Sequence, residues 1–378
     1  MIDPKLIAFY FPQFHAIPEN DKWWGKGFND WMLVEKAKPL FKGHEMPRTP
    51  LYGTYNPCDK ETLVKQAKMA KDYGVFGFMF YHYWFDGKLL LQKPLEVFLE
   101  NKDININFCV CWANETWTRA WTGTREVLIE QKHTQDPSIW EAHFKYLLPF
   151  FKDPRAIKKN GKPVFLIYRP ALLKGTKKMF DFWQKLAKEN GLEGLYIIAV
   201  KGYDFSNNTN FLEYYDGIMN FQPREVYNAP SFKGNKTSKF QFLRLLPPKL
   251  WNMVSDIYFK YRGRTIIDGS KIWDAILGKA CKEEFPQYHL DVYESGFSEW
   301  DNTPRYNNKA KIFTRPPREN LESYVSELYR IASENDSEFV FWNAWNEWSE
   351  SSYLEPDTKR GFENLEIIKE VFHKKTMQ

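Results

Sequence analysis

Two glutamates near the end of the chain have the residue type and spacing to do chemistry. Glu347 and Glu350 belong to the segment F-V-F-W-N-A-W-N-E-W-S-E at 339–350. The first four residues are typical of a buried strand, so both acids follow the carboxyl end of that strand. If the chain is helical there, positions i and i+3 share one face with Cβ atoms about 5–6 Å apart. This is near the spacing at which two carboxyls can act on one sugar.

The residues around the two acids favour a site over the structural alternative, an acidic first turn of a helix. We expect Trp345 and Trp348 to form flat apolar walls, and Asn343 and Asn346 to make directional hydrogen bonds. Sugar-binding clefts use aromatic rings in this way, because an aromatic side chain offers a flat apolar body. The aromatic share of the whole chain, 18%, is also higher than an ordinary core needs.

The elements that must position these residues alternate along the chain. Short apolar runs predict strands at 6–11, 75–81, 104–112, 163–168, 195–200, 217–221, a seventh between 289 and 300, and 339–342. Helical periodicity predicts helices at 59–74, beginning at an Asp59 cap, and at 138–150, 177–190, 318–333 and 361–373. This order favours an α/β fold, a (β/α)8 TIM barrel forming one catalytic domain over 1–378. A doubly wound sheet would need a glycine-rich phosphate loop after an early strand, and the sequence has none.

Active sites of such barrels lie at the carboxyl ends of the strands. Polar and aromatic residues concentrate at these positions in the sequence. We therefore expect the substrate to be bound by Tyr10, Gln13, His82, Trp84, Trp112, Asn114, Glu115, Trp117, Trp300 and Asp301.

Three of these residues have structural alternatives. His82 is expected to donate a hydrogen bond to the substrate, with core packing as its alternative. Glu115 is either a third acid of the site or the ion-pair partner of Arg119. Asp301 is similarly either a site residue or the partner of Arg305.

Composition excludes several classes of function. The net charge of +5 is spread along the chain, which gives no case for nucleic acid. The four cysteines form no CxxC pair, so we expect reduced thiols, with Cys109 and Cys111 on one face of a strand. No zinc pattern or nucleophilic triad is present, and we expect no metal and no cofactor. The N-terminus resembles no signal peptide and no run reaches the ~18 apolar residues of a membrane span, which predicts a cytoplasmic protein.

A long insertion is expected between strands six and seven, at 227–285. Its segment 227–282 carries eleven Lys or Arg and three acids, with apolar residues on one helical face. A cap packed on the barrel rim is the favoured interpretation. The alternative is peripheral contact with anionic lipid at the inner membrane.

Three motifs resemble a known family: F-Y-F-P-Q-F-H-A-I-P-E-N-D near the N-terminus, W-A-N-E-T-W at 112–117, and W-N-A-W-N-E-W-S-E at 342–350. They resemble WbsX-type proteins of bacterial O-antigen and capsule gene clusters, which are similar to glycoside hydrolase family 99. The resemblance covers nearly the whole chain. Family 99 enzymes are retaining endo-α-mannosidases on (β/α)8 barrels with a Glu-x-x-Glu pair after the last strand.

This resemblance implies roles for the two acids. Glu347 would draw the proton from the sugar 2-hydroxyl, and Glu350, kept protonated, would serve the leaving oxygen. A 1,2-anhydro sugar would form and then be opened with net retention. Family 99 has His where this chain has Ser349, and its enzymes are generally exported, so the α-mannoside specificity does not transfer directly.

Three classes of function stay open. The first is a retaining glycosidase or transglycosylase acting on an oligosaccharide or polysaccharide of surface polysaccharide metabolism. The second is a glycosyltransferase that uses an activated sugar donor, and the third is a glycan-binding barrel without catalysis. A nucleotide-sugar enzyme usually needs a diphosphate site, such as a glycine-rich helix N-terminus. The sequence has no such motif, which favours the first class.

Overall fold

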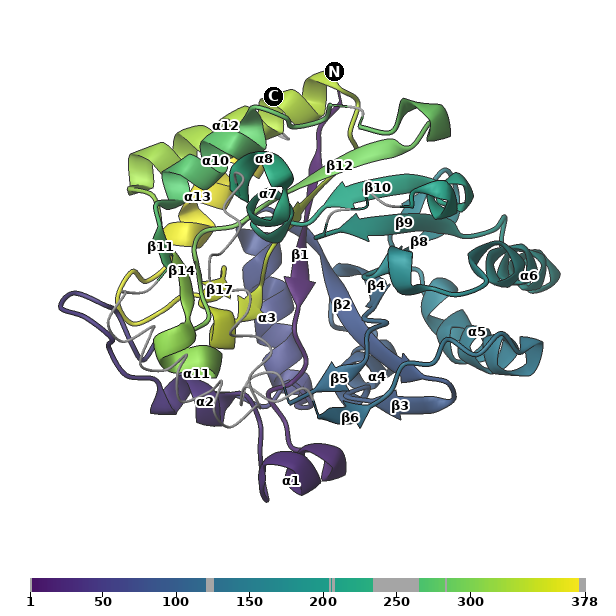
Figure 1. Cartoon of the computed structure of the whole chain (residues 1–378), viewed down its shortest axis with the longest axis horizontal. Helices are drawn as coiled ribbons and strands as arrows, with labels where there is room; N and C mark the ends of the chain where they lie inside the picture. Colours follow the sequence, from purple (N-terminus) through teal and green to yellow (C-terminus); the bar gives the residue numbers. More distant parts are fainter. Residues whose placement is uncertain are drawn as a thin grey trace, which may run out of the picture.

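Eight parallel strands close into a barrel (Figure 1). The computed structural model describes residues 2–119, 126–203, 205, 208–233, 265–282 and 284–373. The ring closes because β1 pairs with both β2 and β15. Its strands are β1 (Lys5–Tyr10), β2 (Val75–Phe85), β4 (Asn107–Trp112), β8 (Lys162–Ile167), β9 (Tyr196–Lys201), β10 (Gly217–Asn220), β12 (Asp291–Gly296) and β15 (Phe339–Trp342). The predicted (β/α)8 barrel is confirmed, and each predicted strand corresponds to one of these eight.

Helices cover the outside of the barrel, with α5 and α6 on one side and α10, α12 and α13 on another (Figure 1). The longer helices are α3 (Lys60–Asp72), α4 (Lys93–Glu100), α5 (Pro137–Phe151), α6 (Thr176–Glu189), α10 (Gly269–Leu277), α12 (Arg318–Glu334) and α13 (Glu363–Phe372). The five predicted helices are present, with ends shifted by one or two residues. Asp59 precedes α3 as predicted, but its side chain makes no capping hydrogen bond. The described residues between β9 and β10 form a 3-10 turn, η3 (Asn210–Tyr214), in place of a longer helix.

Shorter elements complete the connections. The short helices are α1 (Pro18–Trp24), α2 (Trp31–Lys36), η2 (Pro170–Leu172), α7 (Arg224–Asn228), α8 (Pro230–Lys233), η5 (Pro286–Tyr288), α11 (Thr303–Tyr306), η6 (Asn307–Lys309) and η7 (Trp348–Glu350). The short strands are β3 (Lys88–Leu90), β5 (Trp117–Thr118), β6 (Val127–Ile129), β7 (Lys158–Lys159), β11 (Thr265–Ile267), β13 (Trp300–Asp301), β14 (Lys311–Phe313), β16 (Asn346–Glu347) and β17 (Ser352–Tyr353).

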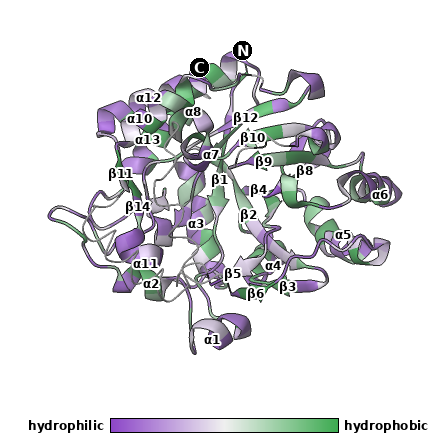
Figure 2. Ribbon diagram, in the orientation of Figure 1, coloured by the Kyte–Doolittle hydropathy of each residue, from purple (hydrophilic) through white to green (hydrophobic). Residues whose placement is uncertain are grey.

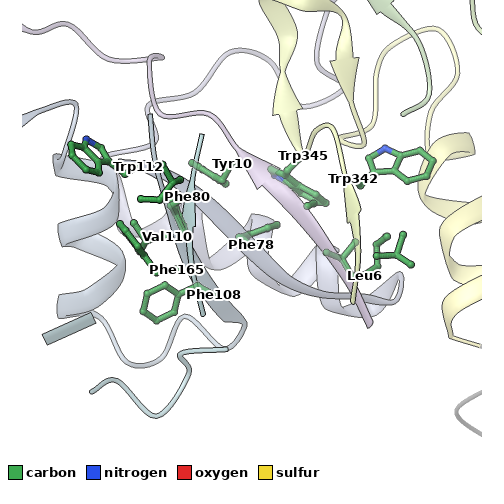
Figure 3. Packing of buried hydrophobic residues seen from close by; sticks show 14 of the residues in the cluster. Leu6, Tyr10, Phe78, Phe80, Phe108, Val110, Trp112, Phe165, Trp342 and Trp345 are labelled. Atoms are coloured by element: carbon green, nitrogen blue, oxygen red, sulfur yellow. The ribbon is translucent and has the colours of Figure 1, made fainter. Parts of the chain in front are cut away.

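Side chains alternate between the two faces of each barrel strand, which creates two apolar layers. One layer fills the barrel and includes Phe9, Cys109, Cys111 and Phe341. The other lies between the strands and the helices, where Figure 3 shows Phe78 between Tyr10 and Trp345. Figure 2 accordingly shows hydrophobic residues in the central strands and hydrophilic residues on outer helices such as α6. Cys109 and Cys111 share one face, as predicted, and all four cysteines are free.

The insertion between β10 and β12 is described only in part, and residues 234–264 of the predicted basic segment lie outside the described residues. Its described end contributes β11, which pairs in parallel with β14. It also contributes α10, which packs against α12 and α7. Among the described residues, no helix combines the length and the apolar character that a membrane crossing requires.

Candidate active site

The two glutamates lie on a short hairpin that follows the last barrel strand. β16 pairs antiparallel with β17, and the 3-10 turn η7 joins them. Ser351 ends the turn in the left-handed conformation, with φ of 49°. Glu347 belongs to β16 and precedes the turn, whereas Glu350 is the last residue of the turn. The two acids therefore do not share a helix as the sequence suggested, but both accept hydrogen bonds from Arg305.

Three predicted site residues hold this hairpin in place instead of lining a cavity. The Asn346 side chain accepts a hydrogen bond from the Phe11 amide at 2.7 Å and donates to the Phe11 carbonyl at 3.0 Å. Trp345 is fully buried in the layer outside the barrel (Figure 3). Trp348, also fully buried, stacks on Tyr353 with 3.8 Å between ring centres. The expectation that these residues contact the sugar is replaced by a supporting role.

One arginine joins the two acids. Arg305 donates from Nη2 to Glu347 Oε1 at 2.9 Å and from Nη1 to Glu350 Oε1 at 2.7 Å. Its Nη2 also donates to Asp30 Oδ2 at 2.8 Å. All four side chains are largely buried, with at most 13% exposed. Buried charge-assisted bonds of this kind are short and strong, so they fix the geometry of the acid pair.

The surroundings push the pKa values of the two glutamates apart. Burial raises the pKa of Glu347 to about 8, against the lowering effect of Arg305. Burial would also raise the pKa of Glu350, but the charges of Arg305 and Arg224 and the hydrogen bond from Trp300 bring that pKa below its ordinary value. Burial therefore favours a proton on Glu347, whereas the two arginines favour the ionised form of Glu350.

The Ser349 hydroxyl lies between Asp30 and Glu347. Its Oγ lies 2.6 Å from Asp30 Oδ2 and 2.9 Å from Glu347 Oε1. A hydroxyl carries one proton and can donate to only one of them. When it donates to Glu347 Oε1, that oxygen accepts from both Ser349 and Arg305, which favours the ionised form of Glu347 and opposes the effect of burial. The expectation that Glu350 holds the proton stays a prediction.

A cleft with two connected parts adjoins the pair. The larger cavity, of about 380 Å³, is lined by both glutamates. The smaller cavity, of about 280 Å³, is lined by Glu350 and not by Glu347. They share six lining residues: Tyr203, Phe221, Arg224, Tyr306, Asn343 and Glu350. Glu350 consequently stands at the junction of two cavities whose sizes suit small ligands.

Four further predicted residues reach the cleft or support it directly. Gln13, Glu115 and Trp117 line the larger cavity. Trp300 lines the smaller cavity and donates from Nε1 to Glu350 Oε2 at 2.6 Å. Gln13 also donates to Asp30 at 2.7 Å, so it orients an acid that contacts Arg305.

Four other predicted residues point away from the cleft: Tyr10, His82, Trp84 and Trp112. Tyr10 donates to Gln66 of α3 at 2.8 Å. Nε2 of His82 lies 2.8 Å from Nε2 of His143 in α5. Trp112 donates to the Trp84 carbonyl at 3.0 Å in the same outer layer. The neighbours Phe11, Tyr81, Tyr83 and Ala113 line the larger cavity in their place. The predicted residues are each next to a residue that lines the cavity. The sequence does not show which side chains point into the barrel, because both faces of a barrel strand are apolar.

Glu115 and Asp301 have other partners than the sequence predicted. Glu115 forms an ion pair with Arg169 at 2.8 Å and not with Arg119, whose carboxylate partner is Glu126. Asp301 is buried beside His44, at 2.7 Å, rather than Arg305. Asn114 makes hydrogen bonds to the backbone of Arg169 at 2.8 and 3.1 Å. Asn114 and Asp301 are therefore supporting residues behind the cleft.

Sequence reasoning missed several residues of the site, chief among them Asp30 and the bridging role of Arg305. The aromatic walls of the larger cavity were also missed, except Trp117: Phe11, Trp24, Tyr81, Tyr83, Tyr168, Tyr203, Phe221 and Tyr306. A usable signal did exist for Arg305, since a buried acid pair needs a cation and this arginine follows a strand end. Across the described residues, no three His, Cys, Asp or Glu side chains gather as metal ligands would.

The model of one protein family, Glycosyltransferase WbsX, matches residues 6–368. The chain belongs to this family. The resemblance inferred from the tryptophan-rich motifs is confirmed. Membership places the chain among carbohydrate-active proteins, which agrees with an acid pair in an aromatic cleft.

Two curated relatives, both called uncharacterized protein WxcX, come from two strains of Xanthomonas campestris pv. campestris. Each is 31% identical over 370 residues, which is 97% of this chain and 49% of the relative. The chain thus spans about half the length of the curated relatives it matches.

Solved structures share the barrel. A glycoside hydrolase-like protein superposes with a TM-score of 0.56 at 14% identity, covering 98% of this chain and 94% of that protein. The GH99 endo-α-mannosidase from Bacteroides thetaiotaomicron, in complex with bis-tris-propane, superposes with a TM-score of 0.56 at 15% identity, covering 100% of each chain. At these identities the likeness shows the fold.

Proposed function

We propose that this protein processes glycosidic bonds with retention, as a glycoside hydrolase or transglycosylase, on an oligosaccharide or polysaccharide of bacterial surface polysaccharide metabolism. The observation that carries the proposal is the pair Glu347 and Glu350, joined by Arg305 at the carboxyl end of the barrel. Two carboxyls with pKa values pushed apart are the usual equipment for acid and base catalysis at a sugar. The resemblance to family 99 supports an α-mannoside-like linkage.

The cavities suggest how the substrate lies. Glu350, at the junction, would face the glycosidic oxygen between a sugar in the larger cavity and a unit in the smaller one. Glu347, within the larger cavity only, would face the 2-hydroxyl of that sugar. The aromatic side chains around it provide flat surfaces for the sugar ring.

The proposed reaction has two steps. Glu350 gives its proton to the leaving oxygen as the C1–O bond breaks, and Glu347 takes the 2-hydroxyl proton while O2 bonds to C1. The product of this step is a 1,2-anhydro sugar. The oxygen of water or of a sugar hydroxyl then bonds to C1 as the C1–O2 bond breaks. The attacking hydroxyl gives its proton to Glu350 and Glu347 returns its proton to O2, so the original anomer is restored.

The reaction needs a proton on Glu350, whereas the surroundings raise the pKa of Glu347 and lower that of Glu350. We propose that substrate binding moves a proton to Glu350. A glycosidic oxygen at Glu350 would take the place of its bond to Arg305, and that bond contributes to the low pKa of Glu350. A 2-hydroxyl at Glu347 would favour the ionised form there, because it donates to the carboxylate.

Transfer from an activated sugar donor is the second candidate, and it is favoured by the basic lining of the smaller cavity. The two are separated by incubating the purified protein with aryl glycosides and with nucleotide sugars, and following product anomers by NMR. Turnover of aryl glycosides with retention supports the first. Turnover of nucleotide sugars alone supports the second, and binding without turnover of either leaves a glycan-binding barrel.

We also propose a cytoplasmic location with residues 227–285 as the region for contact with the inner membrane. The support is the excess of Lys and Arg in that region. Co-sedimentation with anionic vesicles should weaken steeply with salt. No binding at low salt would leave the segment as a cap on the barrel.

A further inference from the structure

One buried glutamate takes no part in the proposed reaction. Glu355 follows the hairpin that carries the two acids, and it is 7% exposed. It lines neither cavity of the cleft, but a separate cavity of about 970 Å³ that also borders α3. A role for Glu355 must consequently act through its neighbours, because its side chain does not face a substrate in the cleft.

Three side chains from separate parts of the chain donate to this carboxyl. Oε2 of Glu355 accepts from the Tyr55 hydroxyl at 2.6 Å and from Trp348 Nε1 at 2.8 Å. Oε1 accepts from Nε2 of Gln66, in α3, at 2.6 Å. Burial raises the pKa of Glu355 to about 7, against the lowering effect of these hydrogen bonds. Because all three partners are donors, the ionised carboxyl satisfies them together.

These bonds reach the chain on both sides of Glu347. Trp348, the residue that follows it, donates directly to Glu355. Asn346, the residue that precedes it, donates from Nδ2 to the Tyr55 hydroxyl at 3.2 Å. That hydroxyl gives its own proton to Glu355. Both sequence neighbours of Glu347 are thus connected to one carboxylate.

The other end of this series of hydrogen bonds is fixed to the barrel. Oε1 of Gln66 accepts from the Tyr10 hydroxyl, in β1, at 2.8 Å, and both side chains are buried. The bonds therefore run from β1 through α3 and Glu355 to the hairpin. Tyr10, which the sequence predicted at the substrate, belongs to this support.

We propose that Glu355 is a positioning residue, which holds the hairpin so that Glu347 and Glu350 meet the substrate in the required geometry. The part that these acids play rests on the proposed function. Charge-assisted hydrogen bonds are short and strong, so removal of the charge should loosen the hairpin. A displacement of about 1 Å near the reacting groups can cost about 100-fold in rate.

Glu355→Gln tests this role. The new amide presents an N–H group to Gln66 Nε2, which is also a donor, so one bond of the series is lost. We expect kcat for an aryl α-mannoside to fall by about tenfold or more, with KM little changed because Glu355 does not face the ligand. Hydrogen exchange of the hairpin segment 343–355, measured by mass spectrometry on the full chain, should become faster.

Gln66→Glu combined with Glu355→Gln exchanges the amide and the carboxylate. Tyr55 and Trp348 can then donate to the amide oxygen at position 355, whose N–H group donates to the carboxylate at position 66. The Tyr10 hydroxyl can donate to that carboxylate as well. The double variant should therefore recover kcat and slow hydrogen exchange in the hairpin, although it carries two buried substitutions.

Tyr55→Phe is a second probe, because it removes the bonds to Glu355 and Asn346 without changing a buried charge. It should also lower kcat and speed exchange in the hairpin. Glu294→Gln is the matched control: Glu294 is buried in β12, burial raises its pKa to about 7 as well, and its carboxyl accepts from Asn220. Its kcat and hairpin exchange should equal those of the wild type, whatever its Tm.

An unchanged kcat in both Glu355→Gln and Tyr55→Phe would overturn the inference. A loss of kcat without faster exchange in the hairpin, or a loss that the double variant does not reverse, would also overturn it. If the wild type cleaves no glycoside, the proposed function fails, and hydrogen exchange alone decides whether Glu355 holds the hairpin.

Discussion

Glu347 and Glu350 accept hydrogen bonds from the same guanidinium, that of Arg305, at 2.9 and 2.7 Å. The two acids nevertheless differ, because Glu350 also faces Arg224 and accepts a bond from Trp300, whereas Glu347 lies deeper beside Ser349. These contacts raise the pKa of Glu347 and lower that of Glu350.

Glu350→Gln should abolish cleavage of glycosides with poor leaving groups, with a loss of about 10²–10⁴-fold in kcat/KM, because these need a proton on the leaving oxygen. Aryl glycosides with good leaving groups should be largely spared. Steady-state kinetics on both substrate types provides the measurement. Glu115→Gln, which changes another glutamate of the cleft, should alter kcat/KM to the same extent for both substrate types. If Glu350→Gln also lowered kcat/KM equally for both types, the acid role of Glu350 would be wrong.

Activity should fall as pH rises through about 8. The pair then loses its shared proton, since the raised pKa of Glu347 is the last of the pair to titrate. Two ionised carboxylates have no proton to give to the leaving oxygen. The fall in kcat/KM at alkaline pH should therefore be steepest for substrates with poor leaving groups. The profile of kcat/KM from pH 5 to 10 gives the result. A rate that stays constant across pH 7–10 would contradict the prediction.

Glu347→Gln should change how stability depends on pH. The folded-state pKa of Glu347, about 8, lies above the ordinary value of 4.5. Between these values the folded chain holds a proton that the unfolded chain has lost, so wild-type stability falls as pH rises through this window. Glutamine keeps the neutral form at every pH. The Tm difference between variant and wild type should therefore grow from pH 5 to pH 8, and parallel curves in thermal melts would exclude the raised pKa.

The sequence was enough to predict the barrel, because eight apolar runs separated by helical periods leave few alternatives. It also located the acid pair, since carboxylates among tryptophans are unusual. It did not identify the inner face of the strands, so His82 was selected where Tyr81 and Tyr83 line the cavity. Nothing local distinguishes these neighbours, because β2 is packed on both faces.

The roles of the tryptophans show a second limit. Trp345 and Trp348 stand beside the acids in sequence, yet their side chains are fully buried beneath the hairpin. The residues that meet the acids instead come from distant loops, as Asp30 and Arg305 do. Contacts between residues so far apart in the sequence form only when the barrel closes, so no local sequence pattern predicts them.

Arg305→Met should destabilise the protein by about 3–5 kcal/mol at pH 8, the usual cost of removing one partner from a buried ion pair. Asp30, Glu347 and Glu350 would then be buried without their bridging cation. The destabilisation should be smaller at pH 5, where the glutamates can bind protons. Chemical denaturation at pH 5 and pH 8 measures the free energy of unfolding of variant and wild type. Adding Glu347→Gln should recover part of the loss, and equal destabilisation at both pH values would show that packing, not charge, is responsible.

The last prediction separates the anhydro route from the usual retaining mechanism. In the usual route the second carboxylate attacks C1 and forms a glycosyl ester. In the proposed route Glu347 contacts only the 2-hydroxyl, so a donor with fluorine in place of that hydroxyl should bind without turnover. Intact-mass analysis after incubation with a 2-fluoro glycosyl donor should show unmodified protein.

Two further measurements complete this test. Calorimetry should show that the donor binds, because an empty site would also give unmodified protein. Glu347→Gln should still bind the natural ligand, since glutamine retains the shape of the side chain and can accept from Arg305. A 2-fluoro donor with a good leaving group would accumulate as an ester on an ordinary nucleophile, because the fluorine slows breakdown of the ester. A mass increase of one fluorosugar that maps to Glu347 would therefore replace the anhydro route with direct attack by this carboxylate.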